Sequence, residues 1–156
     1  MEDFSKATAG IIAPPPILYL ASLFSGLSFN FASPAPIASY IMAASIGALL
    51  FLLSASFARW SFVTMRRHDT SANPRAQSAA LVTSGPFAIS RNPIYVAMTG
   101  LYLGIALLVN SWWPVTILPV LLGVMHWGVI VREERYLAAQ FGEVYLRYKE
   151  KVRRWL

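Results

Sequence analysis

The sequence predicts an all-α polytopic membrane protein with about four transmembrane helices, followed by C-terminal amphipathic helices that lie at the membrane interface. The composition is 56% hydrophobic and only 13% charged, whereas soluble domains have about a quarter of their residues charged. Several apolar runs approach the ~20 residues that a helix needs to cross a bilayer. The basic residues also gather in a few segments, which leaves the turns between neighbouring runs uncharged.

The apolar runs place the four predicted spans at residues 11–31, 36–57, 94–109 and 112–131. We expect a single membrane domain over residues 1–156. Its predicted parts are the first two membrane helices (11–57), a cytosolic loop with a candidate binding motif (58–93), a helical hairpin (94–131) and interfacial helices (132–156).

Positive charge predicts the orientation of the chain. The turns 32–36 and 110–111 carry no charge, whereas 58–93 and the tail from Arg132 onward hold nearly all the Lys and Arg. Cytoplasmic loops are enriched in these residues. Both termini and the long loop are therefore expected in the cytosol, with the protein in an inner or plasma membrane. Basic segments also bind anionic head groups, so membrane lipids are expected partners.

Other classes of site are excluded or disfavoured by the composition. The chain has no Cys, which rules out disulfides, zinc–thiolate sites and thiol nucleophiles. Its two His residues, His68 and His126, are too few for a convincing metal site. The N-terminus "MEDFSKATAG" lacks the basic region of a signal peptide. We expect no metal and no nucleic-acid partner.

Small residues and helix breakers mark the packing and the ends of the predicted helices. Gly100 and Gly104 lie four residues apart, which favours close helix packing over the alternative of space for a ligand. After Val131 the apolar residues recur at helical spacing among Lys and Arg, as in basic amphipathic helices. Gly142 is predicted to divide this segment into two helices.

A first candidate site is the stretch "SGPFAISRNPIY". Gly85-Pro86 is typical of a turn, and Asn92 and Pro93 fit the cap and first position of a helix. The positive end of such a helix, together with Arg91, suits an anionic group such as a carboxylate. A membrane-entry turn with a snorkelling Arg explains the same residues equally well.

A second candidate site is the stretch "HWGVIVREERYL". Helical spacing places His126, Glu133 and Glu134 along one face, and carboxylates at the end of a membrane helix usually face a cavity or a cation. Such carboxylates suit ribose hydroxyls, an ammonium or a sulfonium. The alternative is a salt-bridged helix end in which Arg132 and Arg135 neutralise both carboxylates, with His126 as a hydrogen-bonded core residue.

The two sites belong to hairpin partners and could converge on one pocket. The first offers a positive helix end, and the second offers acceptors. Phe87, Tyr95 and Tyr102 would add aromatic faces, which stabilise a sulfonium or quaternary ammonium. A zwitterionic ligand with a carboxylate and an adjacent cation would match this lining.

At these residues the chain resembles a known superfamily. The segments "LVTSGPFAISRNPIY" and "EERYLAAQFGEVYLRYKEKV" are similar to motifs of isoprenylcysteine carboxyl methyltransferases and phospholipid methyltransferases. The matching region covers about residues 77–155, and Asn92 replaces the usual His of the first motif. The resemblance implies a small integral membrane enzyme that uses S-adenosylmethionine. The matching residues are Gly85, Pro86, Phe87, Arg91, Asn92, Pro93, Tyr95, Glu133, Glu134, Leu137, Phe141, Gly142, Tyr145 and Tyr148.

The resemblance also implies roles for individual residues. Arg132 is a stand-in for an arginine that is assigned to the substrate carboxylate in eukaryotic members. From the chemistry of methyl transfer, an amine acceptor would need a base, for which His126 and Glu134 are the candidates. The acceptor is expected to be lipophilic or small and apolar, such as a prenylcysteine-like carboxylate, a lipid amine or a thiol. The alternatives are a membrane reductase that uses NADPH and a non-enzymatic membrane subunit. The implied cofactor contacts are Ala79, Ala80, Leu81, Val82, Phe87, Arg91, Asn92, Pro93, Ile94, Tyr95 and Glu133.

Overall fold

The computed structural model describes residues 10–68 and 80–156, and in these residues it contains helices and no strands. The all-helical prediction is therefore confirmed. A short 3₁₀ turn, η2, and a π turn, η3, accompany the α-helices. The elements are α1 (Pro15–Ala32), α2 (Tyr40–Arg67), η2 (Gly85–Ala88), α3 (Pro93–Leu108), α4 (Trp112–Met125), η3 (His126–Ile130), α5 (Val131–Phe141) and α6 (Glu143–Lys151).

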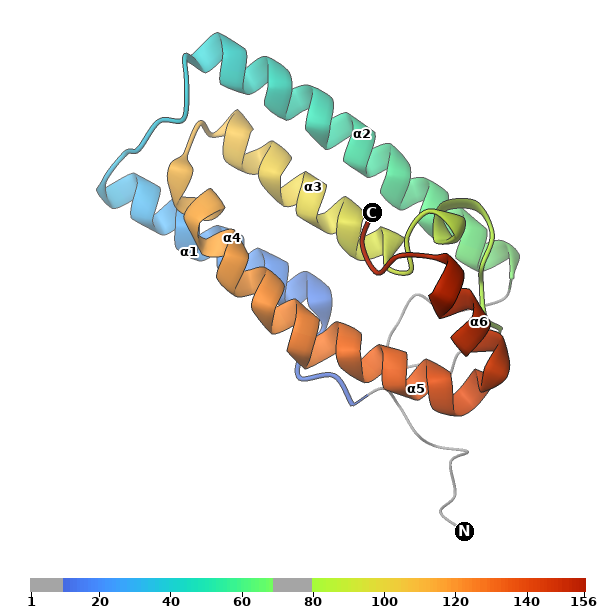
Figure 1. Ribbon diagram of the computed structural model, residues 1–156. Coiled ribbons are helices and arrows are strands. Elements are labelled where there is room, and N and C mark those ends of the chain that lie inside the picture. Colours follow the sequence, from blue (N-terminus) through green and yellow to red (C-terminus); the bar gives the residue numbers. More distant parts are fainter. Residues whose placement is uncertain (1–9, 69–79) are drawn as a thin grey trace.

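The long helices lie side by side in pairs. Figure 1 shows α2 along α3 and α1 along α4, with α5 and α6 gathered at one end. Glycines allow the close approach of α2 and α3: a Cβ at Gly104 would lie 3.0 Å from the backbone nitrogen of Phe51, and one at Gly100 would overlap the hydroxyl of Ser54. These contacts confirm that Gly100 and Gly104 serve helix packing.

Two helices in the described part of the chain are long and apolar enough to cross a membrane. They are α2 and the continuous helix Trp112–Phe141, whereas α3 is a shorter apolar helix. Only 17% of the apolar window of α2 is buried, whereas the core helix of a soluble protein is mostly buried. Its exposed Leu49, Leu52 and Leu53 therefore fit a lipid environment. Four membrane spans stay a prediction.

The ends of the helices follow local signals with one difference. Helix α3 begins at Pro93, and Gly142, at a φ of 51°, separates α5 from α6 as predicted. Helix α2, however, extends past the predicted end of the second span at Phe57 to Arg67. The apolar signal ends at Arg59, but no Gly or Pro lies between Arg59 and Arg67 to end the helix earlier.

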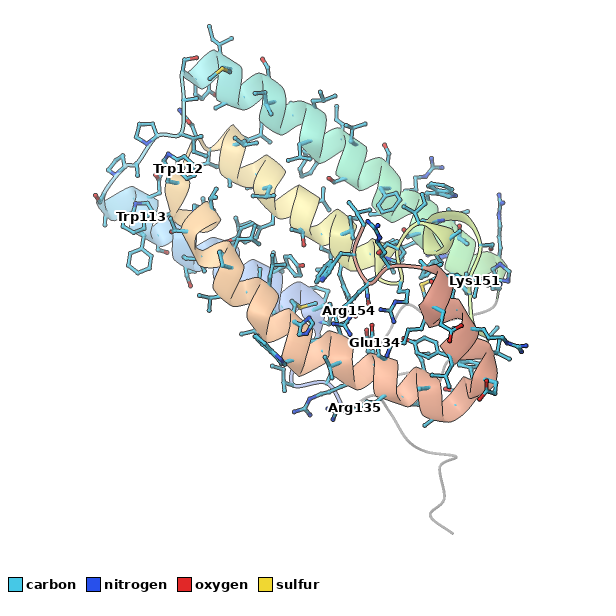
Figure 2. All side chains as sticks on the ribbon, viewed as in Figure 1. Trp112, Trp113, Glu134, Arg135, Lys151 and Arg154 are labelled. Atoms are coloured by element: carbon cyan, nitrogen blue, oxygen red, sulfur yellow. The ribbon has the colours of Figure 1, made fainter. Side chains whose placement is uncertain are left out.

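A pair of tryptophans and a group of basic residues lie at opposite ends of the molecule. Figure 2 shows Trp112 and Trp113 at the end where α3 connects to α4, and Arg135, Lys151 and Arg154 at the end that carries α5 and α6. This separation agrees with the single-sided positive charge expected from the sequence. The side of the membrane that each end faces stays a prediction.

Candidate functional site

The last residues of the chain fold back onto the start of α3. The backbone N–H of Arg91 donates to the carbonyl of Arg153 at 2.9 Å. The hydroxyl of Ser90 and the side-chain amide of Asn92 donate to the carbonyl of Arg154 at 3.2 and 2.9 Å. The C-terminal tail, residues 153–156, is thus fixed against the Arg-Asn-Pro motif (Figure 1).

Asn92 occupies the predicted N-cap position of α3, but its side chain does not form the capping hydrogen bond. Its amide points instead to the tail carbonyl of Arg154. The carbonyl of Arg154 is an acceptor that the sequence around Asn92 could not reveal, and the side-chain amide of Asn92 donates to it.

The side chain of Arg154 reaches Glu134 near the start of α5. Nε donates to Oε1 at 2.9 Å and Nη2 donates to Oε2 at 2.8 Å, which is the paired geometry of a strong Arg–carboxylate contact. Figure 2 shows the two side chains directed at each other. Nη1 of Arg91 lies 3.1 Å from Oε1 of the same carboxylate. Two guanidinium groups thus share one carboxylate.

Two side-chain nitrogens of Arg91 lack a hydrogen-bond partner among the described residues, although the guanidinium group also interacts with the buried side chain of Tyr145. Its side chain is 9% exposed, as is that of Glu134. Nε and Nη1 are buried and have no hydrogen-bond partner among the residues that the structure describes, so the contact of Nη1 with Glu134 is an ion pair without hydrogen-bond alignment. Buried donors of this kind are costly when unpaired, so an acceptor that reached them would be stabilising.

His126 lies beside the same arginine. Nη1 of Arg154 is 3.3 Å from Nε2 of His126 and 3.5 Å from Nδ1. A guanidinium can only donate, so the imidazole nitrogen that faces it acts as an acceptor. His126 is therefore in contact with the cluster formed by Arg91, Glu134 and Arg154, which we call the arginine–glutamate cluster.

The π turn η3 brings His126 and Glu134 to one side of their helix. Two turns of a regular α-helix take ~7.2 residues, and a π turn adds roughly one more. Residues eight positions apart therefore align across η3. The turn contacts the N-terminal segment, because the N–H of Ile12 donates to the carbonyl of Gly128 at 3.2 Å. A Cβ at Gly128 would overlap the Ile12 side chain.

Glu133 has a different partner from its neighbour. The hydroxyl of the buried Tyr95 donates to Oε1 of Glu133 at 2.8 Å, which connects α3 to α5. Arg132 donates to the carbonyl of Gly10 at 2.8 Å and lies exposed, so it does not join the cluster. The structure thus favours contact of the Glu pair with α3 and the tail over neutralisation by Arg132 and Arg135.

The turn η2 is held between α2 and α6. Gly85 has a φ of +60°, and a Cβ there would lie 3.2 Å from Oγ1 of Thr64 in α2. On the other side, the hydroxyl of Tyr148 donates to the carbonyl of Phe87 at 2.6 Å. Burial raises the pKa of Tyr148, so its hydroxyl stays protonated as the donor.

The remaining predicted residues differ in burial. Val82 and Pro93 are buried, whereas Ala80, Leu81 and Ile94 are half-buried. Ala79 lies outside the described residues. Tyr102 does not reach the cluster, because its hydroxyl donates to the carbonyl of Pro114 in α4.

A shallow, open apolar groove of about 270 Å³ lies between α2 and α3, next to the motif. Ile89, two residues before Arg91, and Leu156 of the tail both line it. The groove therefore adjoins the two segments that carry Arg91 and Arg154. The other lining residues are Leu53, Ser54, Phe57, Val96 and Ala97.

Sequence reasoning missed Arg154 as a member of the site. The sequence predicts interfacial helices over residues 132–156, and an Arg in such a helix usually faces lipid head groups or water. The structure ends α6 at Lys151 and turns the tail inward. The available signal was the change from the helical pattern to "VRRWL" at the C-terminus.

Comparison with known proteins decides the family. A model of the phospholipid methyltransferase family matches residues 42–144. The chain belongs to this family. The match includes the Arg-Asn-Pro motif and the Glu pair, and it confirms the resemblance to the isoprenylcysteine carboxyl methyltransferase and phospholipid methyltransferase superfamily. Family membership indicates a membrane methyltransferase.

Similarity to individual proteins is narrower. An uncharacterized protein of Haemophilus influenzae is 67% identical over 27 residues, which are 17% of this chain and 43% of that protein. The match thus spans less than half the length of that relative. No solved structure matches the chain.

Proposed function

We propose that this protein is an integral membrane methyltransferase that transfers the methyl group of S-adenosylmethionine to a lipophilic or small apolar acceptor. Family membership supports the methyltransferase class. The observation that carries the proposal is the meeting of the two motifs at the base of α3. Tyr95 bonds Glu133 there, and Arg91 pairs with Glu134. These motifs lie far apart in the sequence, so their contact supports the interpretation that they form one binding site.

The residues at this position fit the chemical groups of S-adenosylmethionine. The unpartnered donors of Arg91 suit its carboxylate, and Glu133 suits the ammonium or the ribose hydroxyls. Phe87 and Tyr95 present aromatic rings of the kind that stabilise a sulfonium. Ala80, Leu81, Val82, Asn92, Pro93 and Ile94 would complete the lining. The bound cofactor would supply a methyl group on a positively charged sulfur.

Positioning is the main contribution that we assign to the protein. The cluster and the Tyr95–Glu133 hydrogen bond hold charged groups in fixed places, and the folded-back tail shields Arg91 from water. Fixed orientation and exclusion of water accelerate a displacement reaction between two bound reactants. No metal is required for this assignment.

The apolar groove is our candidate site for the acceptor. It lies between α2 and α3 and includes the exposed Leu53 and Ile89, so it opens on an apolar face. Such a lining suits an apolar chain or a small apolar molecule.

The candidate bases differ in their surroundings. Glu134 is paired with two guanidinium groups, which makes it a poor proton acceptor. His126 contacts one guanidinium group, that of Arg154, whereas Glu134 contacts two, so we assign proton uptake from an amine acceptor to His126. A carboxylate or thiolate acceptor would need no base. Arg132 is committed to the N-terminal segment, and we propose no contact with substrate for it.

The orientation of the protein follows from its charges. We propose that the end with α5, α6 and the cluster faces the cytosol of an inner or plasma membrane, where S-adenosylmethionine is present. Its basic residues would then follow the positive-inside rule. The whole chain would form one membrane domain.

Ligand binding separates this proposal from a membrane reductase. Isothermal titration calorimetry of the detergent-purified protein should show saturable binding of S-adenosylmethionine and no binding of NADPH. Binding of NADPH alone would favour the reductase. Binding of neither ligand to a folded protein would favour a non-enzymatic subunit.

A further inference from the structure

We propose that Arg154 is a positioning residue that keeps Arg91 available for the carboxylate of the cofactor. The inference rests on the proposed function and adds a role for a residue that lies beyond the matched region, residues 42–144. Its basis is the difference between the contacts that Arg91 and Arg154 make with the buried carboxylate of Glu134.

The division is unequal. Arg154 engages both oxygens of Glu134 through aligned hydrogen bonds of 2.9 and 2.8 Å. Arg91 approaches only Oε1, at 3.1 Å and without hydrogen-bond alignment. Glu134 is thus directed toward the tail, and the Nε and Nη1 donors of Arg91 remain unused in a buried position.

The arginine–glutamate cluster carries a net positive charge. Its two guanidinium groups and one carboxylate sum to +1, and the side chains of Arg91 and Glu134 are each only 9% exposed. Glu133 accepts a hydrogen bond from Tyr95, and His126 faces Arg154. A ligand carboxylate would supply both the missing charge and the missing acceptors.

The backbone of the tail fixes Arg154 in this role. The carbonyl of Arg154 accepts hydrogen bonds from Ser90 and Asn92, and the carbonyl of Arg153 accepts one from Arg91. These bonds explain the function of Asn92, which holds the tail and does not cap α3. They also attach Arg154 to the segment that carries Arg91, so the two guanidinium groups keep their relative positions.

Loss of Arg154 would change the partner of Glu134. The freed carboxylate could turn toward the unused donors of Arg91 and satisfy them. It would then compete with the ligand carboxylate for the same N–H groups. The affinity for ligands that carry a carboxylate would fall, whereas contacts with the rest of the ligand would remain.

A pair of ligands tests this difference. Calorimetry should compare S-adenosylmethionine with decarboxylated S-adenosylmethionine, which keeps the adenosine, sulfonium and ammonium groups. We expect the wild type to prefer the carboxylated form by about 10- to 100-fold, as for a hydrogen bond between charged groups. In Arg154→Gln this ratio should fall toward one, with little change for the decarboxylated form. If Arg154 had a purely structural role, the substitution would lower the affinity for both ligands equally.

Further variants make the result decisive. Arg154→Lys keeps the charge but cannot form the paired contact, so its ratio should be intermediate. Arg135→Gln, an equal charge change at an exposed position of α5, should keep the wild-type ratio. If Arg154→Gln binds each of the two ligands with the wild-type affinity ratio, the inference is overturned but the proposed function is not. Absence of binding of either ligand to the wild type would overturn the proposed function and this inference with it.

Discussion

Glu134→Gln is expected to lower the free energy of unfolding by about 3–5 kcal/mol, the cost of removing one partner of a buried ion pair. The substitution leaves Arg91 buried, with its side chain 9% exposed and without a counter-charge. Arg154 loses the same partner, but its side chain is 29% exposed and can turn toward water. The cost therefore arises chiefly at Arg91. Denaturant unfolding in detergent, followed by tryptophan fluorescence, measures the change.

Glu143→Gln is the matched control for this loss. Glu143 carries the same charge at an exposed position of α6, where substitutions usually change stability by less than about 0.5 kcal/mol. Similar stability of Glu134→Gln and Glu143→Gln would show that the buried cluster does not hold α5 and the tail together.

Glu133→Gln is expected to weaken binding of S-adenosylmethionine by about 10- to 100-fold, the usual value of a hydrogen bond to a charged group. The amide oxygen of Gln can still accept the hydroxyl of Tyr95, which bonds Glu133 at 2.8 Å. The connection between α3 and α5 should therefore persist while the negative charge is lost. Calorimetry of the purified variant measures the affinity.

The control for Glu133→Gln is Glu150→Gln, which removes a carboxylate from an exposed position of α6. This variant should bind S-adenosylmethionine as the wild type does. Unchanged affinity in Glu133→Gln would remove Glu133 from the cofactor site. An equal loss in both variants would indicate an effect of net charge.

Local signals were sufficient for much of the fold. Pro93 marks the start of α3, Gly142 separates α5 from α6, and the glycines at 100 and 104 pack against α2. Each of these outcomes depends on the conformational properties of one residue or on spacing along one helix. The family resemblance also selected Arg91, Tyr95 and both Glu residues, which the structure brings together at the base of α3.

The rest depends on contacts between distant segments. Asn92 is a reasonable helix cap by its position, but its amide meets a tail carbonyl 62 residues away. The common face of His126 and Glu134 was expected from helical spacing, but it depends on a π turn, which a pattern of 3.6 residues per turn does not contain. Arg154 is one of several basic residues after Val131, and only the folded chain distinguishes it from the others.

Methyl transfer is the most direct test of the central claim. The purified protein would be incubated with S-adenosylmethionine labelled in its methyl group and with apolar carboxylates, amines and thiols in separate reactions. We predict transfer of label to an organic-soluble product of at least one acceptor class, retained in Glu150→Gln and strongly reduced in Glu133→Gln. A folded protein that transfers no label to any of the three classes, or equal transfer by Glu133→Gln, would contradict the account.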